Sequence, residues 1–158
     1  MKTDPAFEEF YEREFKTVFR AAYLVCGNRA VAEDATQDAF VRALERWGRL
    51  RGGEWVTGWL ITTAMNLLRR RRRLEAPWRL VTAGPRDETS SLDTGLDVRA
   101  ALRRLPDRQL EAVILHYLVD LPIEEVASLM GCADGTVKAH LAKARQALAQ
   151  AIEKNERR

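Results

Sequence analysis

The sequence LPIEEVASLMGCADGTVKAHLAKARQAL, residues 121–148, carries the clearest structural pattern in the chain. Pro122 suits the first turn of a helix, where its missing N–H would lack an intrahelical partner in any case. Gly131 suits the end of that helix, because glycine adopts the left-handed conformation of a helix C-terminus at little cost. An apolar stripe at helical spacing follows, formed by Val137, Leu141, Ala144 and Leu148. The stretch therefore predicts two helices joined by a tight turn.

The outer face of the second predicted helix favours DNA binding. This face is mildly basic and consists partly of small side chains; it comprises Ala139, Ala142, Lys143 and Gln146. Such a helix, placed second in a helix-turn-helix, has the shape that enters a major groove. An αα-hairpin in any helical bundle would show the same spacing. Both interpretations stay open until the remaining chain is considered.

Composition is that of an ordinary globular protein. The chain has 158 residues, of which 46% are hydrophobic and 31% charged, so one or two small domains are expected and wholesale disorder is excluded. Its net charge of +3 does not by itself imply a nucleic-acid partner. The two cysteines, Cys26 and Cys132, lie in different segments, which excludes a disulfide framework or a thiolate zinc site. We expect reduced thiols and no metal or other cofactor.

No membrane or export segment is predicted. No stretch approaches the roughly 20 apolar residues that span a bilayer. The acidic, amphipathic N-terminus is also unlike a signal peptide. We therefore expect a cytoplasmic protein with no membrane insertion.

Helical periodicity runs through the whole chain, and no segment alternates as a strand would. Residues 75–94 contain Pro77, Gly84, Pro85 and a polar, acidic cluster, which predicts a flexible linker. The expected fold is therefore all-α, with two small helical domains at residues 1–74 and 95–158. Residues 5–26 are predicted to form one long helix or two abutting ones, and further helices are predicted at 29–47, 56–74, 96–105 and 107–119. Asp4 and Asn28 are the expected N-caps of the helices that begin at residues 5 and 29.

The helix predicted at 29–47 has two contrasting sides. Its core-facing arc comprises Ala32, Ala35, Thr36, Ala39, Phe40, Ala43 and Trp47. The other side gathers Asp34, Gln37, Asp38, Val41 and Glu45. A solvated face would explain these polar residues, but Val41 among them suits a polar protein interface with one apolar contact.

Residues 48–55, GRLRGGEW, predict a basic loop with tryptophans at both ends. Such a loop can hold an unstacked base, although a plain connection between helices explains it equally. In the helix that follows, the expected buried residues are Val56, Leu60, Thr63, Ala64 and Leu67. The expected outer residues are Trp59, Thr62, Met65, Asn66, Arg69 and Arg73. The five consecutive arginines at 69–73 repel one another unless a polyanion neutralises them. They continue a helical pattern, which disfavours a disordered basic tail.

The helix predicted at 107–119 has an apolar stripe that ends near a histidine. This stripe comprises Leu110, Val113, Ile114 and Tyr117. His116 lies beside it without a partner ligand in the sequence, so we interpret His116 as a packing residue.

Three stretches together resemble bacterial RNA polymerase sigma factors. They are AEDATQDAFVRAL at 32–44, WLITTAMNLLRRRRR at 59–73 and the stretch at 121–148 quoted above. Their order and spacing are similar to those of the extracytoplasmic-function (ECF) group of the sigma-70 family, which keeps only the second and fourth sigma domains. The resemblance covers residues 7–152. It implies a promoter-specificity subunit that binds core polymerase, reads the −35 and −10 elements and promotes strand opening.

The resemblance also implies which residues of the first domain make contacts. Those expected to bind the clamp coiled coil of the polymerase β′ subunit are Asp34, Gln37, Asp38 and Val41. The loop from Arg49 to Glu54, with Arg51, is expected to capture a flipped base of the single-stranded −10 element. The residues expected to hold that strand and its phosphates are Trp59, Asn66, Arg69, Arg70 and Arg73.

For the second domain, the resemblance implies a helix from Gly135 in the major groove of the double-stranded −35 element. Thr136 and Lys138 would face phosphates, and the positions that read bases or line the groove are Ala139, His140, Ala142 and Lys143. Many relatives have Asp at Arg70, and often Ser and Arg at Ala139 and His140, which implies a different promoter sequence here. The acidic linker would run toward the RNA exit path, and the β subunit and an anti-sigma factor are further expected partners.

The sequence disfavours two other classes of function. TVKAHL also resembles the recognition helix of response-regulator transcription factors, but residues 1–74 lack the βα alternation of a receiver domain. An enzyme is disfavoured, because the sequence has no phosphate-binding glycine loop, paired catalytic carboxylates or nucleophile elbow.

Overall fold

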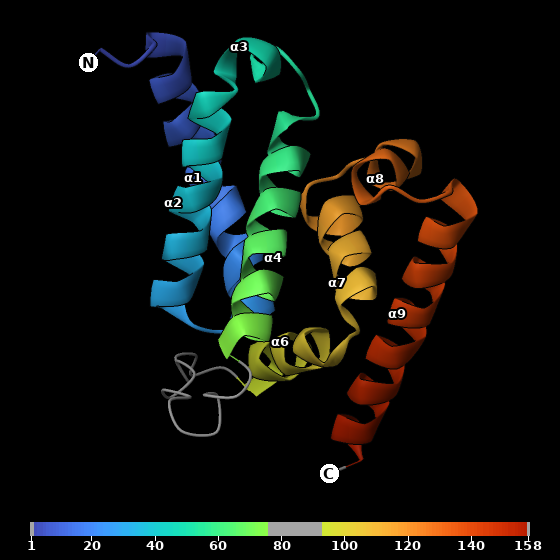
Figure 1. Cartoon of the computed structure of the whole chain (residues 1–158). Helices are drawn as coiled ribbons and strands as arrows, with labels where there is room; N and C mark the ends of the chain where they lie inside the picture. Colours follow the sequence, from blue (N-terminus) through green and yellow to red (C-terminus); the bar gives the residue numbers. More distant parts are fainter. Residues whose placement is uncertain (1, 76–92, 158) are drawn as a thin grey trace. The chain divides into compact units, whose positions relative to one another are not determined.

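The computed structural model describes residues 2–75 and 93–157, and every regular element in these two ranges is a helix (Figure 1). The chain divides into two compact units, residues 1–86 and 87–158. This confirms the expected all-α fold with two helical parts. The predicted acidic linker lies almost entirely at residues 76–92, which are outside the described residues.

Unit 1 is a bundle in which the three long helices all pack against one another (Figure 1). The side chain of Asp4 accepts a hydrogen bond from the N–H of Ala6 at 2.9 Å, and Asn28 accepts one from Val31 at 3.0 Å. Both predicted N-caps are thereby confirmed. The helices of this unit are α1 (Pro5–Cys26), α2 (Arg29–Glu45), α3 (Trp47–Leu50) and α4 (Val56–Glu75).

The core of unit 1 combines small residues of α2 with aromatic residues of α1, α2 and α3. Alanines and Thr36 on α2 are buried, which lets the neighbouring helices approach closely. The Thr36 hydroxyl donates to the carbonyl oxygen of Ala32 at 2.7 Å, so this buried polar group is satisfied. Phe7 packs edge-on against Phe40 and Trp47, with ring centroids 6.5 and 5.2 Å apart. The predicted core-facing arc of α2 is thus largely confirmed, with Trp47 only half-buried.

The predicted orientation of α4 was wrong in part. Met65, expected on the outer side, is 1% exposed, and Ile61 is fully buried, whereas Thr63 and Leu67 are only half-buried. The reason is that α4 packs against both α1 and α2, so its buried stripe is wider than one arc and rotated from the expected one. Two boundaries also differ: α2 ends at Glu45, and the expected loop begins with the short helix α3.

Unit 2 contains the helix-turn-helix predicted at residues 121–148. Gly131 ends α8 with a φ of 67°, as predicted, and α9 packs against α6, α7 and α8. Val137, Leu141 and Ala144 are buried on α9, while Leu148 is half-buried. The elements are α6 (Asp93–Arg104), α7 (Asp107–Val113), the π-helical segment η1 (Ile114–Leu118), α8 (Ile123–Met130) and α9 (Asp134–Glu156).

The helix expected at 107–119 changes its winding halfway, which corrects the predicted stripe. A π-helical turn has more residues per turn, so it shifts the phase of every later side chain. Leu115 is therefore fully buried, whereas Tyr117, expected in the core, is 53% exposed. His116 does more than pack, because its Nδ1 lies 2.8 Å from the carbonyl oxygen of Leu121, to which the Nδ1–H donates.

Candidate nucleic-acid and polymerase interfaces

The outer face of α2 brings together the residues expected to bind the polymerase. Asp34, Gln37, Asp38 and Val41 are all exposed, and their spacing of three and four residues places them on one side of the helix. Val41 is 55% exposed, so it places an apolar side chain among these polar groups. The face therefore offers carboxylates and an amide around one apolar contact.

An ion pair connects this face to α4. The Nη1 atom of Arg71 lies 3.6 Å from Oδ2 of Asp34, with the two side chains 41% and 72% exposed. An ion pair this exposed contributes roughly 0–1 kcal/mol. Sequence reasoning missed the pair, because nothing in the sequence brings the arginine run of α4 next to the start of α2.

The basic segment before α4 is anchored by Asp4. The indole N–H of Trp47 donates to Oδ2 of Asp4 at 3.2 Å, and Nη1 of Arg51 lies 3.5 Å from the same oxygen. Arg49 belongs to α3, so only the residues from Arg51 onward form an open loop. A hollow of about 600 Å³ lies between α1 and this loop, and Arg51, Gly52, Gly53 and Glu54 line one side of it.

Gly52 and Gly53 shape this loop for different reasons. Gly52 has a φ of +83°, which side chains rarely adopt. At Gly53 the limit is space, because an added Cβ would lie 2.7 Å from the indole nitrogen of Trp55.

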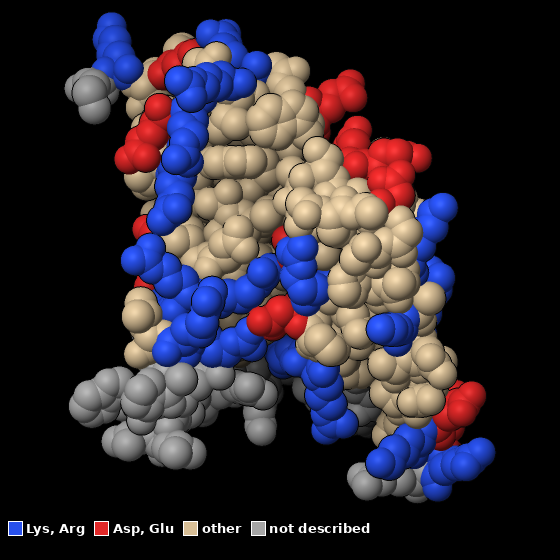
Figure 2. Space-filling view, turned by 45° about the vertical axis from the view of Figure 1, so that its right-hand side comes forward, with Lys and Arg blue, Asp and Glu red and all other residues tan. Residues whose placement is uncertain are grey.

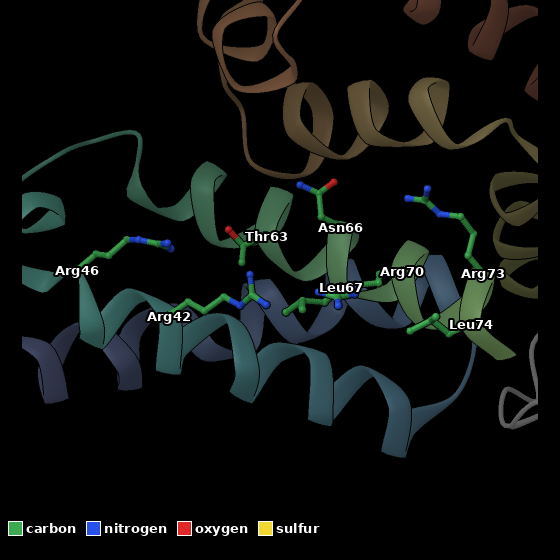
Figure 3. A pocket seen from close by; sticks show the side chains of 8 residues that line it. All are labelled: Arg42, Arg46, Thr63, Asn66, Leu67, Arg70, Arg73 and Leu74. Atoms are coloured by element: carbon green, nitrogen blue, oxygen red, sulfur yellow. The ribbon is translucent and has the colours of Figure 1, made fainter.

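The exposed side of α4 lines a basic groove against the end of α2. Asn66, Arg70 and Arg73 are exposed and project from α4 (Figure 3). Across the groove, whose volume is about 620 Å³, they face Arg42 of α2 and Arg46, which directly follows α2. Neither arginine was singled out from the sequence. Of the other predicted residues, Trp59 and Arg69 are half-buried, and the guanidinium of Arg46 lies 5.9 Å from the ring centroid of Trp59.

The predicted DNA-facing side of α9 is open. Thr136, Lys138, Ala139, Ala142 and Lys143 are exposed, whereas His140 is half-buried. The first residues of α9 also leave backbone N–H groups available, because Ala133 at the N-cap provides no side-chain hydrogen bond. Backbone N–H groups in this position suit a phosphate oxygen.

Arg108 joins α7 to the end of the first helix of the helix-turn-helix. Its Nη2 donates to the carbonyl oxygen of Met130 at 2.5 Å, and its Nη1 donates to Oε2 of Glu111 at 3.0 Å. The side chain of Glu111 is 1% exposed. The spacing of three residues between Arg108 and Glu111 hinted at a helical ion pair. Nothing in the sequence indicated that Glu111 is buried or that Arg108 reaches Met130.

Comparison with known proteins identifies the family. The model of "Sigma-70 region 2" matches residues 10–76, and that of "Sigma-70, region 4" matches residues 95–148. The chain is 34% identical over 151 residues to the ECF RNA polymerase sigma factor SigM of Mycobacterium tuberculosis, with 93% of this chain and 77% of SigM covered. It is 33% identical to the ECF RNA polymerase sigma factor BldN of Streptomyces coelicolor, covering 93% of this chain and 60% of BldN.

Among solved structures, the sigma factor RpoE from Bartonella quintana, in complex with the anti-sigma factor NepR, has a similar fold. The TM-score is 0.76 at 24% identity, with 93% of this chain and 96% of RpoE covered.

Two sigma-70 regions in this order define a sigma factor, the class of protein that binds RNA polymerase and directs it to promoters. Within that class, the chain belongs to the ECF sigma factors of the sigma-70 family. In the described part of the chain, no helix is long and apolar enough to cross a membrane.

Proposed function

We propose that the face of α2 formed by Asp34, Gln37, Asp38 and Val41 binds core RNA polymerase, on the clamp coiled coil of the β′ subunit. The observation that supports this best is that all four side chains are exposed on one side of a helix whose other side is buried. Polar groups around a single apolar contact suit an interface that forms and dissociates.

Unit 1 also binds the −10 element in this proposal. The loop with Arg51 and Glu54, together with Arg49 of α3, holds a flipped base next to α1. Asn66, Arg70 and Arg73 bind the phosphates of the single strand, supported by Trp59 and Arg69. Holding an unstacked base offsets part of the cost of strand opening, which is a few kcal/mol per step. The exposed cations and the hollow beside the loop support this assignment.

Unit 2 reads the −35 element through α9. Thr136 and Lys138 contact phosphates near the helix start, and Ala139, His140, Ala142 and Lys143 face the bases or line the groove. The exposure of five of these six side chains supports the assignment, and His140 contributes less because it is half-buried. The small side chain of Ala139 favours apolar contact with a base, such as a thymine methyl group.

The chain acts in the cytoplasm as a binding protein without an active site of its own, and the chemistry of transcription belongs to the polymerase. An anti-sigma factor is a further partner, since RpoE of Bartonella quintana was solved with the anti-sigma factor NepR.

Transcription in vitro with purified core polymerase tests the proposal. Core alone should start at no specific site on a promoter library, whereas core with this chain should produce transcripts with defined start sites. Absence of both core binding and directed initiation would contradict the proposal. A variant with unit 2 intact and the α2 face altered, Asp34→Ala/Gln37→Ala, should lose activity through core binding.

A further inference from the structure

The basic groove of unit 1 lies between the end of α2 and α4, and only α4 has a proposed role in DNA binding. Arg42 and Arg46 extend from the end of α2 toward α4, and Thr63, Asn66, Arg70 and Arg73 come from the facing side of α4 (Figure 3). The α4 residues are spaced by three, four and three, so they share one side of that helix. The groove has a volume of about 620 Å³ and is open to solvent.

The groove carries four positive charges, and none of the residues that line it is acidic. Asp38 and Glu45 lie next to Arg42 and Arg46 in a neighbouring hollow. Even so, neither arginine has a carboxylate oxygen within 4 Å among the residues the structure describes. Figure 2 shows Lys and Arg side chains following one another along unit 1 and gathering where α4 ends. Cations held this close favour a polyanionic ligand.

The chemistry of the lining suits a nucleic-acid backbone. Guanidinium groups bind phosphate oxygens in a bidentate manner. The amide of Asn66 offers hydrogen bonds to phosphate or sugar oxygens between the arginines, whereas the Thr63 hydroxyl already donates to the carbonyl oxygen of Trp59 at 2.8 Å. Leu67 and Leu74 add apolar surface to the lining, and Leu74 is 69% exposed. A groove with cations on both walls can hold a strand along its length.

On α2, the two arginines adjoin the proposed polymerase face, since Asp38 and Val41 of that face line the same hollow as Arg42 and Arg46. At about 100° per residue, Arg42 and Arg46 point roughly 90–130° away from the centre of the face formed by Asp34, Gln37, Asp38 and Val41. The same helix can therefore contact two partners at once.

We propose that Arg42 and Arg46 bind promoter-DNA phosphates across the groove from α4, so that both helices hold the DNA near the −10 element. This inference rests on the proposed role of α4 in −10 binding. As a consequence, α2 would connect polymerase and DNA directly: one face of the helix would contact the polymerase, and Arg42 and Arg46 at its end would contact the DNA.

The test measures the affinity of holoenzyme, assembled from core polymerase and the full chain, for a promoter fragment across a range of salt concentrations. Each phosphate contact contributes roughly 0.7–0.9 to the slope of log affinity against log salt. The variant Arg42→Ala/Arg46→Ala should therefore lower the slope by about 1.4–1.8 and weaken binding about tenfold at low salt. Preference among promoter sequences and affinity for core should be unchanged.

Two further variants isolate the contact. Lys16→Ala/Arg20→Ala removes two exposed cations one turn apart on α1, away from the groove, and should leave the slope unchanged. Arg42→Lys/Arg46→Lys keeps the charges and should restore most of the slope. A slope for Arg42→Ala/Arg46→Ala equal to that of the α1 variant would overturn the inference. So would a loss of core affinity, because the arginines would then belong to the polymerase interface.

A fourth variant, Arg70→Ala/Arg73→Ala, separates this inference from the proposed function. If the α4 variant lowers the slope and the α2 variant does not, the inference alone is wrong. If neither variant lowers the slope, the role proposed for α4 is wrong as well.

Discussion

Asp34 is the residue at which the two proposed surfaces of unit 1 meet, because it belongs to the polymerase face and also pairs with Arg71 of the arginine run. Replacing Asp34 and Gln37 by Ala should weaken core binding by roughly tenfold or more, since both would be central interface contacts. The free energy of unfolding should change by less than about 1 kcal/mol, because the lost ion pair is exposed. Titration of labelled core with the variant measures the first effect, and urea unfolding measures the second.

Two single variants show whether that loss is specific. Glu33→Ala removes an exposed carboxylate next to Asp34 but off the face, and Arg71→Ala removes the ion pair while keeping Asp34. Both should bind core nearly as well as the unaltered chain. Equal affinity of all the variants would remove Asp34 and Gln37 from the interface.

Among the charged residues described in unit 2, Glu111 should contribute most to stability. Its carboxylate is buried and accepts a hydrogen bond from Arg108, which also holds the carbonyl of Met130. Glu111→Ala would remove this charged hydrogen bond from Arg108, whose side chain is 41% exposed, so the free energy of unfolding should fall by roughly 1.5–3 kcal/mol. Glu111→Gln keeps an acceptor oxygen and should cost less. Equal denaturation midpoints for Glu111→Ala and the unaltered chain would contradict this role.

Within single helices, the buried side could be predicted from the sequence where the helix is regular and packs on one side, but not where the packing or the winding changes. The face of α2 follows from its sequence, because small and polar residues alternate at helical spacing along its whole length. For α4 the apolar pattern predicted the wrong buried side in part, because α4 packs against both α1 and α2, and Met65 and Ile61 are buried. The π-helical turn η1 exposes Tyr117 through a change of winding that depends on packing around residues 114–118. The four-arginine groove likewise needs two helices from different parts of the sequence.

Binding of the −35 element by α9 should depend on Lys143. Lys143 is exposed on the predicted DNA-facing side, opposite the buried Leu141 and Ala144. Lys143→Ala should weaken binding of a −35 duplex by about 1–3 kcal/mol if it contacts a base, and preference at that base pair should relax. If it contacts a phosphate, the loss should be uniform among sequences and the salt slope should fall by about 1. Fluorescence anisotropy with a set of single-substituted duplexes distinguishes the two contacts.

Lys154→Ala is the matched control for Lys143→Ala. Lys154 is exposed on the same helix but roughly 16 Å further along its axis, at about 1.5 Å per residue. Its removal should leave −35 binding almost unchanged. Equal losses for the two lysines would indicate general attraction to DNA, in which case α9 would have no defined reading position at Lys143.

The division of the chain into two units predicts how the effects of substitutions combine. Lys143 belongs to unit 2, and Arg70 and Arg73 belong to unit 1. Changes in separate, independent sites usually add within about 0.5 kcal/mol. The losses in promoter affinity from Lys143→Ala and Arg70→Ala/Arg73→Ala, measured on holoenzyme with a complete promoter, should therefore add within that limit.

Arg42 and Arg70, by contrast, line one groove, so their losses should differ from additivity by more than about 0.5 kcal/mol. Two results together would contradict independent binding by the two units: non-additive losses for substitutions in different units, and additive losses for Arg42 and Arg70. Promoter affinity would then depend on coupling between the units and not on the groove.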